Sequence, residues 1–381
     1  MSQPKPRLAW IDNLRTFAIL LVVNMHACVT YSHVGDWYTM SAREPSLAEK
    51  VPFLFWQGHL QAFFMGLLFF VSGYFAQLSL TRKGPAAFLR ERVIRLGLPT
   101  LLYMLVIHPF ILLGLNPWHA DFPPAGEFYA HYLSTGKFIG SSGPLWFAFA
   151  LLIFCTLLAT WHALRPAVPA SSFTPPAGAA RLWRFGLILV LATFLVRIVQ
   201  PVGTSWLNFQ FCFFAQYVAA FLVGLAAAQH GWLIALAASP VARRAGWLAL
   251  IGGPLLLATV MFLGGPPTGK DAYPYNGGWH PQAVGLALWE QLAGLGLSLG
   301  LLAHFSTKFN GAGRLARWLA DRSFGVYVLH APVLVALTIA LRPWESASPY
   351  LLVALLTTAG LIGSFLLADL ARRIPGLRSI L

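Results

Sequence analysis

The sequence predicts an all-α, polytopic membrane protein: one bundle of about ten transmembrane helices with both termini in the cytoplasm. Two observations lead to this fold class. The 381 residues are 57% hydrophobic and only 10% charged, with a mean hydropathy of +0.67, whereas a soluble domain needs a more charged surface. Apolar runs of around 20 residues also recur along the whole chain, as they do in proteins that cross a bilayer repeatedly.

The first half of the chain holds five predicted spans, each an apolar run of roughly membrane length. They are residues 14–32, 57–80, 97–115, 144–164 and 185–200. An outer loop, 33–56, joins the first two, and another, 116–143, joins the third and fourth. The linker 165–181 is rich in Pro, Ala and Ser, which favours a flexible cytoplasmic loop within a single domain, 1–381.

The second half holds five more predicted spans. They are residues 209–228, 247–264, 283–306, 323–341 and 349–370. A third long outer loop, 264–282, precedes the eighth span. Several aromatic side chains lie in the three outer loops. The sequence allows two roles for them, an interfacial aromatic belt or a platform for sugar rings, and we favour the belt. They are Trp37, Tyr38, Trp118, Tyr129, Tyr273, Tyr275 and Trp279.

The basic residues between the spans test this count. With the N-terminus in the cytoplasm, nineteen Lys and Arg residues lie in cytoplasmic segments and five in outer loops. The five are Arg43, Lys50, Lys137, Lys270 and Arg342. This bias follows the positive-inside rule, and one span more or fewer would break the alternation. The net charge of +14 therefore reflects membrane topology and predicts no nucleic-acid partner.

Charged and titratable side chains inside spans are candidates for function, because each costs about 2.5–3.5 kcal/mol at the bilayer centre unless it is paired. The candidates are Arg15, His26, His59, His108, Arg197, Glu290 and His330. Arg15 and His26 are eleven positions apart, which places both on one helix face, separated by roughly 16 Å. We expect Arg15 at the cytoplasmic mouth of a path and His26 within it.

Glu290 is predicted at the depth of His26, where its carboxylate would orient the imidazole. The alternative is a structural glutamate that bonds a backbone or Trp partner. His59 and Arg197 are predicted near the outer mouth. For His26 itself, the alternative is a structural histidine buried between helices.

Arg92 and Arg95 lie just before the third predicted span, in the stretch RERVIR. Arginines clustered at a helix start suit phosphate groups, although a topology signal that binds anionic lipid is an equal alternative. The glycine patterns of nucleotide-binding loops are absent from the sequence, and its histidines do not have metal-ligand spacing, so no metal is predicted.

Several of these stretches resemble the acyltransferase 3 family of integral-membrane acyltransferases. RLAWIDNLRTFAILLVVNMHA resembles its first helix, in which a basic residue is followed after ten residues by His, here Arg15 and His26. FFMGLLFFVSGYFA resembles its second helix, with Ser72 and Tyr74 in the Ser-Gly-Tyr element. RVIR, GPLWF and SFGVYVLHAPVL resemble further elements of the family, so that the resemblance covers residues 8 to about 340.

YSHVGDWY and GGWHPQAVGLALWEQ look most like the branch called glucan biosynthesis protein C, which is associated with succinylation of periplasmic glucans. The resemblance implies a bacterial inner-membrane enzyme. Such an enzyme moves an acyl group from cytoplasmic acyl-CoA, either acetyl-CoA or succinyl-CoA, to a hydroxyl of an extracytoplasmic carbohydrate. Its partners would be membrane lipids and that acceptor, and a homodimer stays open.

The resemblance also implies roles for individual residues. His26 would be the general base, with Glu290 fixing its tautomer, or it would form an acyl-histidine intermediate. Donor-side residues would be Arg15, Arg92 and Arg95 at the CoA phosphates and Ser72, Tyr74 and His330 along the channel. Acceptor-side residues would be His59, Trp146 and Arg197. Helix–helix hydrogen bonding stays an alternative for Tyr74 and His330.

A rival function comes from a different class of protein, a proton-coupled transporter or flippase of a saccharide or lipid-linked substrate. His26 and Glu290 would then form a proton relay. Inverted repeats with interrupted helices would support a transporter, and the two halves of the sequence do not have them.

Overall fold

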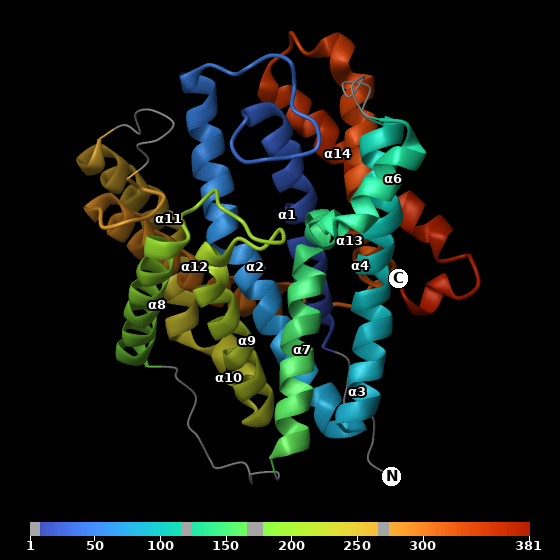
Figure 1. Cartoon of the computed structure of the whole chain (residues 1–381). Helices are drawn as coiled ribbons and strands as arrows, with labels where there is room; N and C mark the ends of the chain where they lie inside the picture. Colours follow the sequence, from blue (N-terminus) through green and yellow to red (C-terminus); the bar gives the residue numbers. More distant parts are fainter. Residues whose placement is uncertain (1–7, 116–122, 166–177, 266–273) are drawn as a thin grey trace.

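The computed structural model of the protein describes residues 8–115, 123–165, 178–265 and 274–381 and consists of a helical bundle (Figure 1). Within these ranges there is no β-strand. The outer-loop residues Trp118, Lys270 and Tyr273 lie outside the described ranges, so their predicted roles stay predictions.

Ten helices of the described chain are long and apolar enough to cross a membrane, which confirms the predicted fold class. Most of them are built on one α-helix: α1 (Ala9–Ser32), α2 (Leu47–Lys83), α8 (Ala179–Val199), α9 (Phe214–Gln229, preceded by a short turn, Phe211–Phe213), α11 (Pro240–Gly264), α12 (Pro281–Lys308), α13 (Arg314–Leu341, followed by a short turn, Arg342–Trp344) and α14 (Pro349–Ala371). The other two are composite, α7 (Trp146–Leu164) with the turn Gly143–Leu145, and the segment Pro85–Leu115.

The composite segment Pro85–Leu115 alternates α-helix with π-helical turns. It contains α3 (Pro85–Arg92), α4 (Leu98–Leu102) and α5 (His108–Phe110), with π-helical turns at Val93–Gly97, Tyr103–Ile107 and Ile111–Leu115. The described ranges also contain two shorter helices, α6 (Ala125–Ser134) toward the upper end in Figure 1 and α10 (Trp232–Ala238) between α9 and α11.

The predicted boundaries differ most from the structure at the second and third spans. The helix α2 begins at Leu47 and not at 57, because Ser46 and Glu49 form a reciprocal capping box that starts the helix in the predicted outer loop. The third helix begins at Pro85 and not at 97. Arg92 and Arg95 therefore lie inside a continuous helical segment, and their predicted position at a helix start is wrong.

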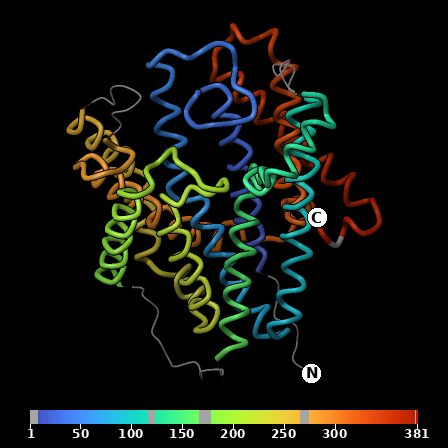
Figure 2. The backbone as a smooth tube through the Cα atoms, viewed as in Figure 1, coloured from blue at the N-terminus to red at the C-terminus, as the bar shows by residue number. Residues whose placement is uncertain are grey.

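The helix α1 lies at the centre of the bundle, where it packs against α2, α12, α13 and α14 (Figures 1 and 2). The burial of the helices agrees with this position. In the most apolar 18 residues of each helix, 67% are buried in α1 and 78% in α2, whereas only 17% are buried in α11. A polar side chain on α1 therefore faces other helices, whereas most of α11 is available to lipid.

Close backbone contact joins α2 to α9. A Cβ atom at Gly73 would lie 2.2 Å from the carbonyl oxygen of Phe221, and one at Gly224 would lie 2.1 Å from that of Phe70. Small residues at such crossings let membrane helices approach closely and gain van der Waals contact. These two glycines explain how the second and sixth spans pack without intervening side chains.

We expect Gly224→Ala to lower the free energy of unfolding by about 1–3 kcal/mol, because the added methyl group forces α2 and α9 apart. Thermal unfolding in detergent measures this as a lower Tm. The matched control is Gly252→Ala on α11, where an added Cβ would meet no heavy atom within 4 Å. Equal Tm values for the two variants would contradict the close-packing interpretation.

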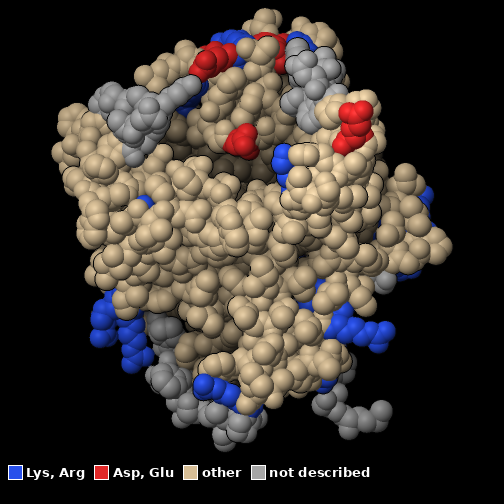
Figure 3. Space-filling view, in the orientation of Figure 1, with Lys and Arg blue, Asp and Glu red and all other residues tan. Residues whose placement is uncertain are grey.

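Charge is distributed unevenly between the two ends of the molecule. Figure 3 shows Lys and Arg gathered mainly at the lower end, Asp and Glu at the upper end and an almost uncharged band between them. This distribution is the three-dimensional form of the positive-inside pattern. The cytoplasmic orientation of the lower end stays a prediction.

Candidate functional site

His26 on α1 lies in a cluster of three nearly parallel aromatic rings. The indole of Trp37 covers it at a centroid distance of 3.9 Å and an interplanar angle of 19°. The imidazole of His330, on α13, lies 5.3 Å from it at 21°. Trp37 and His330 are themselves 6.2 Å apart and nearly parallel. We call these three residues the ring triad.

The ring triad holds three buried polar atoms without a hydrogen-bond partner among the described residues: Nδ1 of His26, Nε1 of Trp37 and Nε2 of His330. Buried polar groups are almost always paired, so three orphaned atoms at one place indicate a site that accepts a ligand or water. His26 is half-buried and its Nε2 has no protein partner in the described chain, which leaves this nitrogen for a ligand.

Trp37 reaches His26 because the segment after α1 folds back over the end of the helix (Figure 2). His33 ends α1 in the left-handed conformation, with a φ of 55°. The amide of Ser41 then donates to the carbonyl of Thr30 at 3.0 Å, and the Gln57 side chain donates to the carbonyl of Val34 at 3.0 Å. The predicted aromatic belt therefore does not describe Trp37.

A second aromatic cluster supports Trp37 from the side. The next residue, Tyr38, contacts the indole edge-on at 5.2 Å. Its hydroxyl forms hydrogen bonds with Nδ1 of His108 at 2.7 Å and with the Tyr103 hydroxyl at 3.0 Å. Burial raises the pKa of Tyr38, so the hydroxyl stays protonated.

His330 is held in one tautomer. Its Nδ1 donates to the carbonyl of Tyr327 at 2.8 Å, and because a carbonyl only accepts, the proton is on Nδ1 and Nε2 carries a lone pair. The Tyr327 hydroxyl donates to the carbonyl of Pro144, which ties α13 to the start of α7. Two predicted site residues, His26 and His330, thus lie together in the structure.

Glu290 does not pair with His26, and this prediction is wrong. Both carboxylate oxygens accept from Nη2 of Arg197, at 2.9 and 2.7 Å, and Gln291 donates to the same carboxylate at 3.0 Å. Arg197 is fully buried, and its Nε donates to the carbonyl of Cys212. A cation at this depth attracts the carboxylate more strongly than a neutral imidazole does.

The Arg197–Glu290 pair changes two earlier expectations. The relay of the transporter hypothesis needs a contact between His26 and Glu290, and the described chain has no such hydrogen bond. Arg197 binds Glu290 through Nη2, and its acceptor-binding role stays a prediction without a supporting contact.

Four other predicted residues lie in separate surroundings. His59 donates to the carbonyl of Phe55 at 2.6 Å and packs edge-on against Trp289 at 5.0 Å, away from the ring triad. Trp146 stacks on Tyr217 at 5.6 Å. Ser72 and Tyr74 are half-buried on either side of Gly73, and the structure gives them no contact with the triad.

The predicted donor-side arginines do not share one site. Arg15 is 43% exposed and forms an ion pair with Asp12. Arg92 points into the bundle, with its guanidinium over the Phe88 ring and its Nε buried. Only Arg95 lines a groove.

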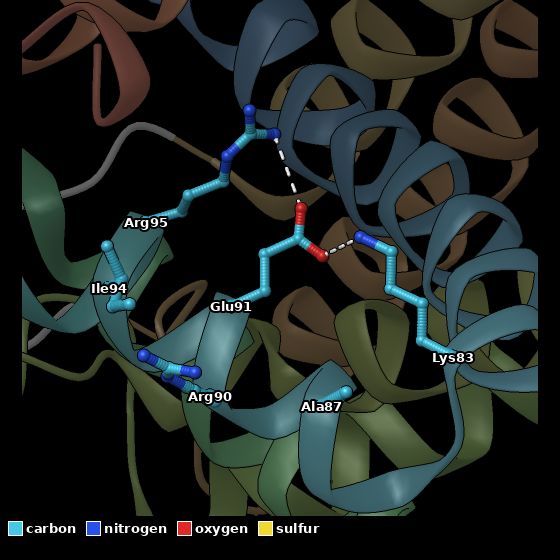
Figure 4. A pocket seen from close by; sticks show the side chains of 6 residues that line it. All are labelled: Lys83, Ala87, Arg90, Glu91, Ile94 and Arg95. Carbon is cyan, nitrogen blue, oxygen red and sulfur yellow. Dashed lines mark hydrogen bonds and ion pairs between the residues drawn. The ribbon is translucent and has the colours of Figure 1, made fainter.

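This groove lies where α2 meets α3 and has a volume of about 490 Å³. Lys83 and Arg95 both turn toward the carboxylate of Glu91, which lies between them, and Arg90 lies on the near side (Figure 4). Three cations against one carboxylate give the groove a net positive lining. Lys83 and Arg90 were not predicted as site residues, although both lie in the basic segment before the third span.

The described residues include no group of three His, Cys, Asp or Glu side chains placed to hold a metal ion. The basic groove is a place in the described chain where cations could hold an anionic cofactor.

Comparison with known proteins shows which family the chain is similar to. A profile described as an acyltransferase domain matches residues 8–369. Relatives named glucans biosynthesis protein C, from Salmonella paratyphi B, Salmonella agona and Salmonella dublin, are each 28% identical over 243 residues. That match covers 60% of this chain and 60% of each relative. No solved structure matches the chain.

Proposed function

The chain belongs to the acyltransferase 3 family, and from this premise we propose that it is a membrane-embedded O-acyltransferase. It takes an acyl group, acetyl or succinyl, from cytoplasmic acyl-CoA and transfers it to a hydroxyl of an extracytoplasmic carbohydrate. The name of the relatives supports a glucan as that carbohydrate.

The observation that carries this proposal is the ring triad. It places a half-buried imidazole with an unbonded Nε2 on the central helix of the bundle, among polar atoms that lack protein partners. A general base needs a free lone pair within reach of the proton that it takes. The unbonded Nε2 of His26 supports this role, as does the course of α1 from the basic end of the molecule toward the other end (Figures 1 and 3).

The reaction then follows from the residues. Nε2 of His26 accepts the proton of the acceptor hydroxyl while the oxygen of that hydroxyl attacks the thioester carbonyl carbon. The C–S bond breaks, and the CoA thiolate takes the proton back from the imidazolium. His26 returns to its neutral form, so no net proton stays on the enzyme.

The basic groove supports a place for the donor. CoA carries three phosphate groups, and Lys83, Arg90 and Arg95 supply cations that bind phosphate through charge-assisted hydrogen bonds. Its volume of about 490 Å³ lies within the range of ligand pockets. Glu91 would release Lys83 and Arg95 to the phosphates.

The experiment that tests the proposed function uses the purified protein in sealed lipid vesicles. Radiolabelled acetyl-CoA or succinyl-CoA is supplied on one side and a glucan on the other, and labelled glucan and free CoA thiol are measured. We expect both products to appear together and only with the donor at the basic end. Failure of both donors to release thiol in the presence of glucan would overturn the proposal.

We expect Arg95→Ala to raise the KM for acyl-CoA about tenfold, since a hydrogen bond to a charged group contributes about 1.5 kcal/mol or more. The kcat should stay near the wild-type value, because the groove does not contact the ring triad. Arg184→Ala, at an exposed cytoplasmic-side position on α8, is the matched control. If the Arg95→Ala protein had the same KM for acyl-CoA as the control, the groove would not be the donor-binding site.

A further inference from the structure

His26 has no carboxylate to orient it. Catalytic histidines commonly donate the proton of one ring nitrogen to a carboxylate, which fixes the tautomer and stabilises the imidazolium. Here Nδ1 of His26 is buried without a partner, and Glu290 is bound to Arg197. The described residues make no hydrogen bond or ion pair between any carboxylate and His26. Something else must hold the ring and stabilise the charge that forms on it.

Ring stacking supplies the orientation. The indole of Trp37 lies over His26 at 3.9 Å and within 19° of its plane, while His330 lies 5.3 Å away, displaced to the side of the imidazole. Stacked rings restrict rotation of the imidazole about its Cβ–Cγ bond. Because the nitrogens lie at the ring edge, contact between ring faces leaves Nε2 open to a ligand.

Stacking also supplies electrostatic stabilisation. The imidazolium that forms on His26 is a cation in a largely buried place, where water stabilises it poorly. The face of an indole carries negative partial charge and attracts a cation, most strongly when both are desolvated. His330 does not cover the imidazole face in this way, because its ring lies farther away and to the side.

We propose that Trp37 is a positioning residue for His26, whose indole face orients the imidazole and stabilises the imidazolium that forms when the acceptor hydroxyl loses its proton. This inference rests on the proposed function and assigns a role to a residue of the outer loop. It also explains the contacts of Tyr38 with His108 and Tyr103, since they fix the residue next to Trp37.

The test replaces the Trp37 indole by a series of mono-, di- and trifluorinated indoles, introduced at this position alone. Fluorine weakens the negative ring face in steps while it barely changes the shape. We expect kcat to fall stepwise, by about tenfold over the series, with little change in the KM for the donor. The matched control is the same series at Trp247 on α11, which is 66% exposed.

Two substitutions complete the test. Trp37→Phe keeps an aromatic face and should retain most of the activity, whereas Trp37→Leu should lose about tenfold in kcat. The proposal would be overturned by a kcat that stays constant over the fluorinated series. An equal loss of kcat in the Trp37→Phe and Trp37→Leu variants would also overturn it. Because the wild-type protein is measured alongside, an inactive wild type would instead mean that the proposed function is wrong.

Discussion

A His26→Ala protein is expected to lose acyl transfer by about a hundredfold or more, because positioned general bases contribute roughly 10²–10⁴-fold to rate. The loss should appear in kcat, with the KM for acyl-CoA nearly unchanged, since the basic groove that would hold the phosphates does not contact His26. Release of CoA thiol in the presence of glucan measures both constants. Wild-type turnover in this variant would show that His26 is not the base.

Two further proteins separate loss of chemistry from loss of structure. His162→Gln changes an exposed histidine at the end of α7 and should keep full activity. His26→Gln keeps most of the side-chain volume beneath Trp37 and should be as inactive as the alanine variant, with a Tm close to the wild-type value. An inactive His26→Gln protein that is also unfolded would count against a purely chemical role.

The second large effect is expected at the Arg197–Glu290 pair. Removing one member of a buried ion pair typically costs about 3–5 kcal/mol, because the remaining charge is left without a partner in a low-dielectric interior. This cost applies in full to the pair, because the Arg197 side chain has 0% accessible surface and that of Glu290 only 6%. We therefore expect Arg197→Leu to lower the Tm strongly and to reduce the yield of folded protein.

The double variant Arg197→Leu with Glu290→Leu distinguishes a structural pair from a catalytic one. Replacing both charges by apolar side chains removes the unpaired charge and should recover much of the Tm. A structural pair also predicts acyl transfer close to the wild-type rate in the recovered protein. Should Glu290→Gln instead keep the wild-type Tm and lose activity, the catalytic role first predicted for Glu290 would be restored.

The candidate site was predictable where it depended on one helix. The spacing to Arg15 predicted that His26 shares its helix face, because a helix has a fixed rise and rotation per residue, whereas the central place of α1 comes only from the structure. The pairing of Arg197 with Glu290 had a weaker signal, since the sequence placed both in the outer part of their spans, the fifth and the eighth, without giving their facing. The pair could have been predicted by assuming that opposite charges at similar membrane depth bind each other before they bind a neutral side chain.

Trp37 had no comparable signal. It lies in a predicted outer loop, where aromatic residues usually anchor a protein at the membrane surface. Its place against His26 depends on the left-handed His33 and on hydrogen bonds from Ser41 and Gln57. The motif YSHVGDWY was noticed in the sequence, but a loop has no periodicity from which side-chain direction follows.

The separation of Arg92 from Arg95 has a similar cause. The sequence placed both before a helix, whereas the helix begins at Pro85 and includes a π-helical turn at Val93–Gly97. The two side chains therefore point in different directions, one into the bundle over Phe88 and the other into the groove.

By itself, the sequence determined the ten apolar helices, because the cost of burying polar backbone and charge in lipid acts on each segment separately. It also determined which few polar side chains lie inside them. Only the tertiary structure decided the partners of those side chains: Trp37 and His330 for His26, and Arg197 for Glu290. Such partners come from segments far apart in the chain, and their choice depends on how whole helices pack and rotate against one another.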